Sequence, residues 1–85
     1  MSLNPSLEAH VRAVLAKQAK LNVEAFGLDP SADLYEAGMT SHASVNVMLA
    51  LEGALGLEFP DELLKRSVFT SIRSISEALA TIDPT

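Results

Sequence analysis

The sequence predicts a small all-α domain, a bundle of four helices, and three observations lead to this prediction. Apolar residues recur at helical spacing in several segments of the chain. Capping residues, prolines and glycines stand where such segments begin and end. The sequence has no pair of β-rich runs joined by turn residues that could form a sheet. With 85 residues and 48% hydrophobic residues, the chain suits one domain over 1–85, with a core at about 5–82 and a tail at 83–85.

The first predicted helix covers about residues 5–20. Asn4 can cap its free N–H groups, and Pro5 at the first helical position removes no hydrogen-bond donor that the helix needs. Basic residues near its end suit the helix dipole. One apolar face of this helix is predicted to consist of Leu7, Val11, Val14 and Leu15.

Residues 21–40 are predicted to form a long loop held in place by buried apolar side chains. The segment contains glycine, proline, asparagine and aspartate at several positions, which favours turns over regular structure. A loop of this length in a compact domain is often functional. The anchoring residues are predicted to be Leu21, Val23, Phe26, Leu28, Leu34, Tyr35 and Met39.

The second predicted helix covers 41–55, and Gly56 is a suitable stop. A short third helix is predicted to begin at Phe59-Pro60 and to end near Arg66, because proline and acidic residues suit a first turn and basic residues suit a last turn. The last helix is predicted to be capped by Thr70 or Ser71 and to end before Pro84. The inward face of the second helix is predicted to comprise Val45, Met48, Leu51 and Leu55, with Val47 beside it.

The same periodicity predicts which side chains form the core. These are Leu7, Val11, Val14, Leu15, Phe26, Leu34, Val47, Met48, Leu51, Leu55, Phe59, Phe69, Ile72, Ile75 and Leu79.

The charge distribution excludes several classes of partner. The net charge is −5, and residues 21–64 hold eight acidic residues and no basic residue. A surface with this charge repels nucleic acid and anionic membranes. No run of eighteen apolar residues and no export signal is visible, and there is no cysteine, so we expect a cytoplasmic protein without a membrane span.

No residue pattern indicates catalysis or a metal site. The chain has two histidines and no cysteine, so the usual zinc ligand sets cannot form. Residues 29–40 have the length of a calcium loop, but Leu34 replaces its glycine and Thr40 its bidentate glutamate. Ser41 and His42 lie side by side without the glycines of a nucleophile elbow.

Ser41 stands at the N-terminus of the second predicted helix, where its hydroxyl should reach solvent. Free N–H groups and the positive end of the helix dipole would favour a phosphate ester on this hydroxyl. The alternative is that Thr40 or Ser41 serves only as an N-cap.

The order of features along the chain distinguishes these alternatives. A helix and a long loop precede the segment Asp33-Leu34-Tyr35-Glu36-Ala37-Gly38-Met39-Thr40-Ser41, and a helix and the segment Glu58-Phe59-Pro60-Asp61-Glu62 follow it. Over roughly residues 5–80 this order resembles the acyl carrier protein family. That family has a G-x-D-S-L pattern, which here reads Gly38-Met39-Thr40-Ser41-His42.

The resemblance implies a four-helix bundle of acyl-carrier type that catalyses nothing itself. It implies that Ser41 carries 4′-phosphopantetheine, whose thiol holds cargo as a thioester in a specialised biosynthetic pathway. The implied partners are a phosphopantetheinyl transferase, an acyl- or aminoacyl-loading enzyme and downstream transferases, acting on a monomer. The cargo remains open between an acyl group and an amino acid loaded by a synthetase-like ligase. A helical interaction module without a cofactor is the alternative from another class.

The second helix departs from ordinary fatty-acid carriers, which have acidic residues along its exposed face. Here the corresponding positions are mostly uncharged, and only Glu52 is acidic within the helix. Desolvation of such a surface favours an apolar or neutral groove on a dedicated loading enzyme. The docking residues are predicted to be Met39, His42, Asn46, Leu49 and Glu52.

Overall fold

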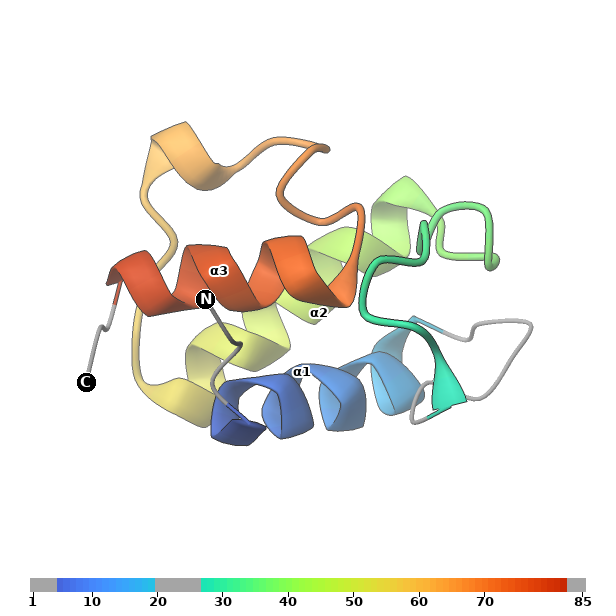
Figure 1. Cartoon of the computed structure of the whole chain (residues 1–85). Helices are drawn as coiled ribbons and strands as arrows, with labels where there is room; N and C mark the ends of the chain where they lie inside the picture. The colour runs from blue at the N-terminus through green and yellow to red at the C-terminus, as the bar shows by residue number, and fades with distance from the viewer. Residues whose placement is uncertain (1–4, 20–26, 83–85) are drawn as a thin grey trace.

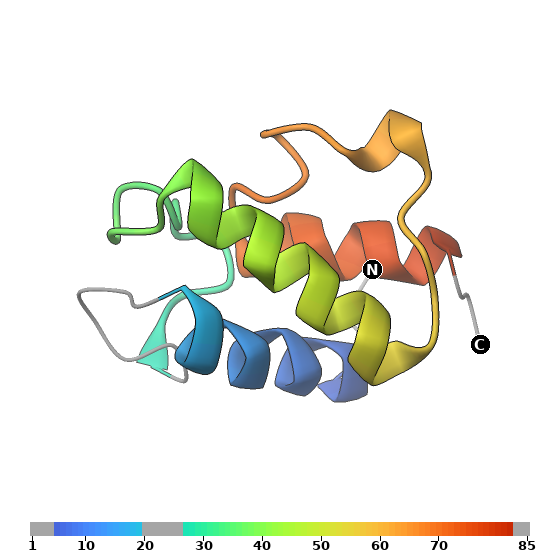
Figure 2. The same cartoon turned by 180° about the vertical axis from the view of Figure 1, so that it is seen from behind.

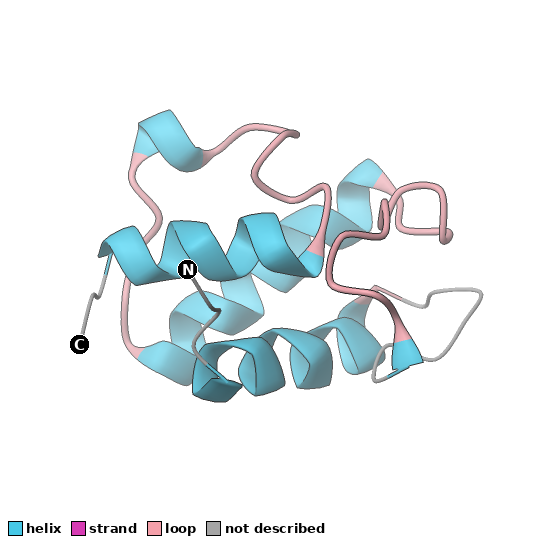
Figure 3. Ribbon diagram, viewed as in Figure 1, coloured by secondary structure: helices cyan, strands magenta, loops and turns pink. Residues whose placement is uncertain are grey.

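The computed structural model describes residues 5–19 and 27–82, and within them the regular structure is entirely helical (Figures 1 and 3). The elements are α1 (Pro5–Gln18), α2 (Ser41–Leu55), the 3₁₀ turn η2 (Asp61–Leu63) and α3 (Ile72–Ile82). The predicted all-α class is therefore confirmed, with a 3₁₀ turn in the place of the predicted third helix. Asn4, Pro84 and the tail 83–85 lie outside the described residues.

Helix α1 is the element against which the other two α-helices pack (Figures 1 and 2). Figure 1 shows α3 running alongside α1, with α2 crossing behind them. The segment 56–71, which includes η2, returns the chain from the end of α2 to the start of α3. None of the described helices is long and apolar enough to cross a bilayer.

The core confirms most of the predicted residues. Leu7, Val14, Met48 and Leu55 are only partly buried and pack against it, while Phe26 lies outside the described residues. Alanines that periodicity did not single out are also buried, because a small side chain lets neighbouring elements approach closely. The predicted residues that are buried are Val11, Leu15, Leu34, Val47, Leu51, Phe59, Phe69, Ile72, Ile75 and Leu79; the additional ones are Ala19, Met39, Ala43, Val68 and Ala78.

Helix α2 has the predicted bounds, but its buried face was predicted in part wrongly. Val45 was placed on the inward face, and its side chain is 49% exposed. The buried residues are Ala43, Val47 and Leu51, which stand four positions apart and therefore share one side of the helix. Apolar residues surround most of α2, so spacing alone could not choose between two possible inward faces. Packing against α1 buries the face that contains Ala43, Val47 and Leu51.

The described part of the loop before α2 is held by buried side chains and backbone hydrogen bonds. Leu34 is fully buried; its N–H donates to the carbonyl of Thr70 at 2.7 Å, and its carbonyl accepts from the N–H of Met39 at 3.0 Å. Arg12 on α1 donates from Nη1 to the carbonyl of Leu28 at 2.9 Å. Leu28 and Tyr35 are half-buried, as anchoring requires. The predicted anchors Leu21, Val23 and Phe26 lie outside the described residues.

The short third helix is smaller than predicted. It is a single 3₁₀ turn that ends at Leu63, and the next residue, Leu64, leaves helical geometry with φ −88° and ψ 68°. The reason lies in the aromatic residues on either side of it. The ring centroids of Phe59 and Phe69 are 5.4 Å apart in the core. The chain between these two residues must therefore turn back on itself. A continuous helix of eight residues would advance about 12 Å in one direction.

Helix α3 begins with a reciprocal serine cap. The hydroxyl of Ser71 accepts from the N–H of Ser74 at 3.0 Å, and the hydroxyl of Ser74 accepts from the N–H of Ser71 at 3.0 Å. Ser71 is therefore the cap, and the Thr70 hydroxyl instead donates to the carbonyl of Arg66 at 2.8 Å. This arrangement satisfies two backbone donors that the first turn of a helix leaves free.

Ser76 on α3 is expected to be a site of stabilising substitution. Its side chain is 2% exposed, and its hydroxyl has no hydrogen-bond partner. Ser76→Ala should raise the free energy of unfolding by about 1–2 kcal/mol, because it removes an unsatisfied buried group and alanine favours helix. Denaturant titration measures this. The control is Ser74→Ala, which removes cap bonds and should lower stability by about 1 kcal/mol. A decrease for Ser76→Ala would contradict the prediction.

Candidate functional site

Ser41 is the first residue of α2, and its side chain is exposed. The capping role belongs to its neighbour: Thr40 has extended backbone geometry, and its hydroxyl accepts from the N–H of Ala43 at 3.0 Å. The Ser41 hydroxyl makes no hydrogen bond within the described residues, whereas its carbonyl accepts from the Ser44 hydroxyl at 2.7 Å. Of the two capping residues that the sequence left open, the structure selects Thr40. The Ser41 hydroxyl is therefore available for chemistry.

The start of α2 has a local field that suits an anion. The backbone N–H groups of Ser41 and His42 donate to no acceptor among the residues that the structure describes. The first turn of α2 contains no acidic residue. Free N–H groups and the helix dipole together stabilise a negative charge at such a position. A phosphate ester on Ser41 would therefore lie in a favourable environment, although the protein as a whole is acidic.

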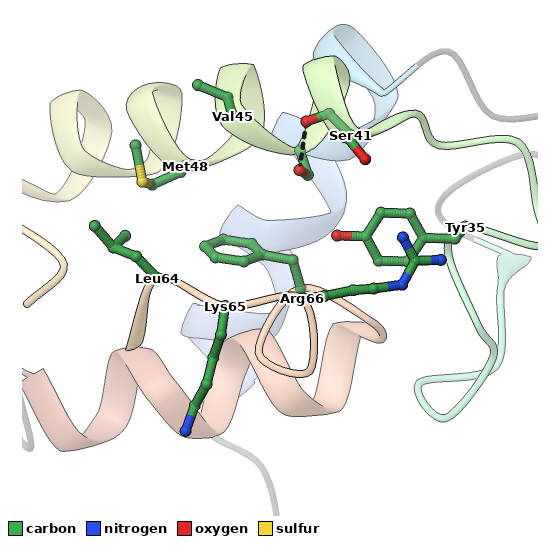
Figure 4. A pocket seen from close by; sticks show the side chains of 9 residues that line it. Tyr35, Ser41, Val45, Met48, Leu64, Lys65 and Arg66 are labelled. Atoms are coloured by element: carbon green, nitrogen blue, oxygen red, sulfur yellow. Dashed lines mark hydrogen bonds between the residues drawn. The ribbon is translucent and has the colours of Figure 1, made fainter. Parts of the chain in front are cut away.

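A pocket of about 420 Å³ lies beside Ser41. Figure 4 shows it between α2 and the segment after η2, with Met48 and Leu64 facing each other across it. Apolar groups make up most of its wall, and none of the lining residues has a carboxylate. The lining residues from α2 are Ser41, Ser44, Val45 and Met48, and those from other segments are Tyr35, Leu64, Lys65, Arg66 and Phe69.

Two cations stand at this pocket, and they are held differently. The guanidinium carbon of Arg66 lies 3.8 Å from the centroid of the Tyr35 ring. Lys65 extends away from α2 in Figure 4. Arg66 thus has a defined position beside the pocket, on the side toward which the Ser41 side chain points (Figure 4). Neither Tyr35 nor Arg66 was identified as a site residue from sequence.

The predicted docking residues lie in different environments. His42 and Leu49 are exposed, and Asn46 is half-buried. Glu52 is half-buried and accepts from the N–H of Phe59 at 2.9 Å, so one oxygen of its carboxylate holds the chain after α2. The prediction of Met39 as a docking residue is wrong, whereas its prediction as a buried anchor of the loop is confirmed: its side chain is 3% exposed and belongs to the core. The residue just before the Thr40 cap points inward, because the chain enters α2 from the anchored loop.

Exposed apolar side chains form a further feature, of which the sequence analysis singled out Leu49 alone. The large hydrophobic residues that are exposed in the described chain are Val45 at 49%, Leu49 at 54% and Leu64 at 45%. Val45 and Leu49 are one helical turn apart on α2, and Val45 and Leu64 both line the pocket. We call these three residues the apolar rim. The spacing of Val45 and Leu49 was visible in the sequence, whereas the contribution of Leu64 was not.

Comparison with known proteins identifies a family and a relative of this chain. The family model described as the phosphopantetheine attachment site matches residues 9–79. An aminoacyl carrier protein of Agrobacterium fabrum is 42% identical over 76 residues, which cover 89% of this chain and 92% of the relative.

Solved structures of carrier proteins in complex with a ligase have the same fold as this chain. The carrier protein from Agrobacterium tumefaciens, in complex with an engineered Bradyrhizobium japonicum glycine:[carrier protein] ligase and ATP, is 42% identical with a TM-score of 0.85; the match covers 89% of this chain and 99% of that chain. A glycylated carrier protein bound to the Bradyrhizobium japonicum ligase, 23% identical with a TM-score of 0.73, shares the fold over 86% of this chain and 97% of that chain.

The fold and the family match define the class of this protein as a helical carrier, which holds a substrate and does not catalyse a reaction itself. This chain belongs to the phosphopantetheine-binding carrier protein family. The resemblance to acyl carriers is thereby confirmed, and the match favours a carrier over a cofactor-free interaction module. The surroundings of Ser41 fit a phosphopantetheine group, because its exposed hydroxyl lies at a helix N-terminus, beside a pocket without carboxylates.

Proposed function

We propose that this chain is an aminoacyl carrier protein that bears 4′-phosphopantetheine on the hydroxyl of Ser41. The observation that supports this most strongly is the 42% identity with an aminoacyl carrier protein over 89% of this chain. The relative bound to a glycine ligase is similar to the same extent. A small amino acid is therefore the proposed cargo, and a synthetase-like ligase is the proposed loading enzyme.

The chain itself contributes an acceptor hydroxyl and a favourable field to the attachment reaction. A phosphopantetheinyl transferase would form a bond between Ser41 Oγ and the phosphorus of 4′-phosphopantetheine. The phosphoanhydride bond of coenzyme A would break and release adenosine 3′,5′-bisphosphate, and the hydroxyl proton would pass to a base of the transferase. Because Thr40 forms the cap, modification of Ser41 leaves the helix start intact. When bound, the group supplies a thiol for a thioester, which this cysteine-free chain lacks.

The apolar rim is the proposed centre of ligase docking, together with His42 and Asn46. Two of its residues, Val45 and Leu49, stand on α2 about one and two turns after Ser41, so a partner that covers the rim also reaches the attachment site. No acidic residue precedes Glu52 on α2, and burial of apolar area would therefore contribute most of the affinity. Downstream transferases are proposed to approach the same surface.

Parallel loading of the modified protein tests the proposed cargo. The protein is first modified with coenzyme A and a phosphopantetheinyl transferase, and mass spectrometry confirms one added group. It is then incubated with ATP, glycine and the Bradyrhizobium japonicum ligase, with other amino acids and ligases, or with malonyl-coenzyme A and a housekeeping malonyl transacylase. We expect an aminoacyl mass increase in at least one ligase reaction. Efficient malonyl transfer without any aminoacylation would contradict the aminoacyl assignment and leave the carrier assignment intact.

Leu49→Glu is expected to reduce aminoacyl loading at least about tenfold, because it places an unpaired charge in the centre of a desolvated contact. The measurement is the initial loading rate at ligase concentrations below saturation. Ala54→Glu is the matched control, since Ala54 is also exposed on α2 but lies on a different side of the helix. A similar loss in both variants would indicate a general charge effect instead of contact at Leu49. The initial rate of aminoacyl loading of the wild-type protein should depend only moderately on salt, because apolar contacts and not charges dominate the proposed docking surface.

A further inference from the structure

Arg66 is a cation without a protein anion, positioned at the pocket that Ser41 also lines. Its guanidinium carbon lies 3.8 Å from the centroid of the Tyr35 ring, and the residue is exposed. Across the parts of the chain that the structure describes, Arg66 forms no ion pair with a carboxylate. The ion pair that is present there joins Arg12 and Glu8 at 2.9 Å.

The contact with Tyr35 restricts the Arg66 side chain but does not use its hydrogen-bond donors. A guanidinium has five N–H groups that point outward in its plane, and an aromatic ring beneath the plane leaves them free. This geometry suits planar recognition of a phosphate or carboxylate, because the orientation is established before the anion arrives. The pair thus presents an ordered donor group toward the pocket.

Arg66 lies at a basic pocket in an otherwise acidic part of the chain. Residues 27–64 include seven acidic residues and no basic one, whereas the pocket wall has two basic residues and no carboxylate. Lys65 extends away from α2, so Arg66 is the cation directed toward the Ser41 side of the pocket (Figure 4). A phosphate attached to Ser41 would therefore lie near this guanidinium, although the surrounding segment of the chain is acidic.

We propose that Arg66, stacked on Tyr35, binds the phosphodiester that joins the prosthetic group to Ser41. The inference rests on the proposed attachment at Ser41. That phosphate is bonded to the serine oxygen itself and carries a negative charge, so it is the part of the group whose position this chain determines most directly. Arg66 would act together with the free N–H groups of Ser41 and His42. Its role is to hold the base of the arm at the pocket, independently of the cargo.

Phosphorus NMR of the modified protein tests this contact without reference to cargo or activity. The wild-type protein and the Arg66→Gln variant are each modified with coenzyme A and a transferase, and mass spectrometry confirms the addition. We expect the ³¹P resonance of the phosphodiester to differ between the two proteins at low salt. The difference should shrink near 1 M salt, where the screening length is about 3 Å. The Arg66 Nε–Hε resonance should also shift between unmodified and modified wild-type protein, while that of Arg12 should not.

Lys65→Gln is the matched control, because it removes the same charge from the adjacent position. If Lys65→Gln and Arg66→Gln shift the ³¹P resonance equally, the effect is a general field and the proposed contact is wrong. Tyr35→Leu should reproduce part of the Arg66→Gln shift, since it removes the stacking surface. An unchanged ³¹P resonance in Arg66→Gln would overturn the inference while leaving the carrier function standing. Absence of any mass increase in the wild-type protein would overturn both.

Discussion

Ser41→Ala is expected to abolish the mass increase that coenzyme A and a phosphopantetheinyl transferase produce, while the protein remains folded. The reason for the complete loss is chemical, since alanine has no oxygen to accept the phosphoryl group. The reason for the intact fold is structural. The Ser41 side chain is exposed and makes no hydrogen bond within the described chain, and Thr40 caps the helix. Stability should therefore change by less than about 0.5 kcal/mol.

Two control variants separate attachment from helix capping. Ser44→Ala removes a neighbouring hydroxyl that lines the same pocket, and it should still be modified. Thr40→Ala should lower stability by about 0.5–2 kcal/mol because it removes the cap, and its folded fraction should still be modified. Modification of Ser41→Ala, detected as the same mass increase, would show that another residue is the attachment site.

Leu51→Ala is expected to lower the free energy of unfolding by about 2–5 kcal/mol, which is a large part of the stability of a small domain. Leu51 is fully buried in the core, and truncation removes apolar contacts and leaves a cavity. Denaturant titration followed by circular dichroism measures the loss. The expected value applies to the unmodified protein, so that the prosthetic group does not contribute.

Leu49→Ala provides the matched comparison on the same helix. Leu49 is 54% exposed, and the same substitution there should cost about 1 kcal/mol or less. The contrast between the two variants tests the orientation of α2 directly. A loss below about 1 kcal/mol for Leu51→Ala would mean that the buried face of α2 has been assigned incorrectly.

The bounds of α2 and the position of Ser41 at a helix start could be predicted from local signals. Helix α2 covers Ser41–Leu55 as predicted, because its limits depend on neighbouring residues: the Thr40 hydroxyl caps the start, and Gly56 ends the helix in the left-handed conformation at φ 66°. Helix α3 begins after Ser71 for the same kind of reason. Such signals act within a few residues and do not depend on what packs against the helix.

Other features depended on contacts between residues far apart in the chain. The predicted third helix is a single 3₁₀ turn, because the packing of Phe59 against Phe69 requires the chain between them to reverse its direction. The Tyr35 and Arg66 pair joins the loop before α2 to the segment after η2. Nothing in the local pattern around either residue indicates the other, so the sequence analysis assigned no site role to either.

The sequence by itself determined the helical class, the limits of α2 and α3, and the position of Ser41 at a helix start. These features follow from backbone hydrogen bonds and caps, whose energies are settled within a turn of helix. Only the tertiary structure decided which face of α2 is buried and that Arg66 lies at the pocket beside Ser41. Apolar residues occupy most sides of α2, so the choice among its faces depends on the shape of α1 and the anchored loop.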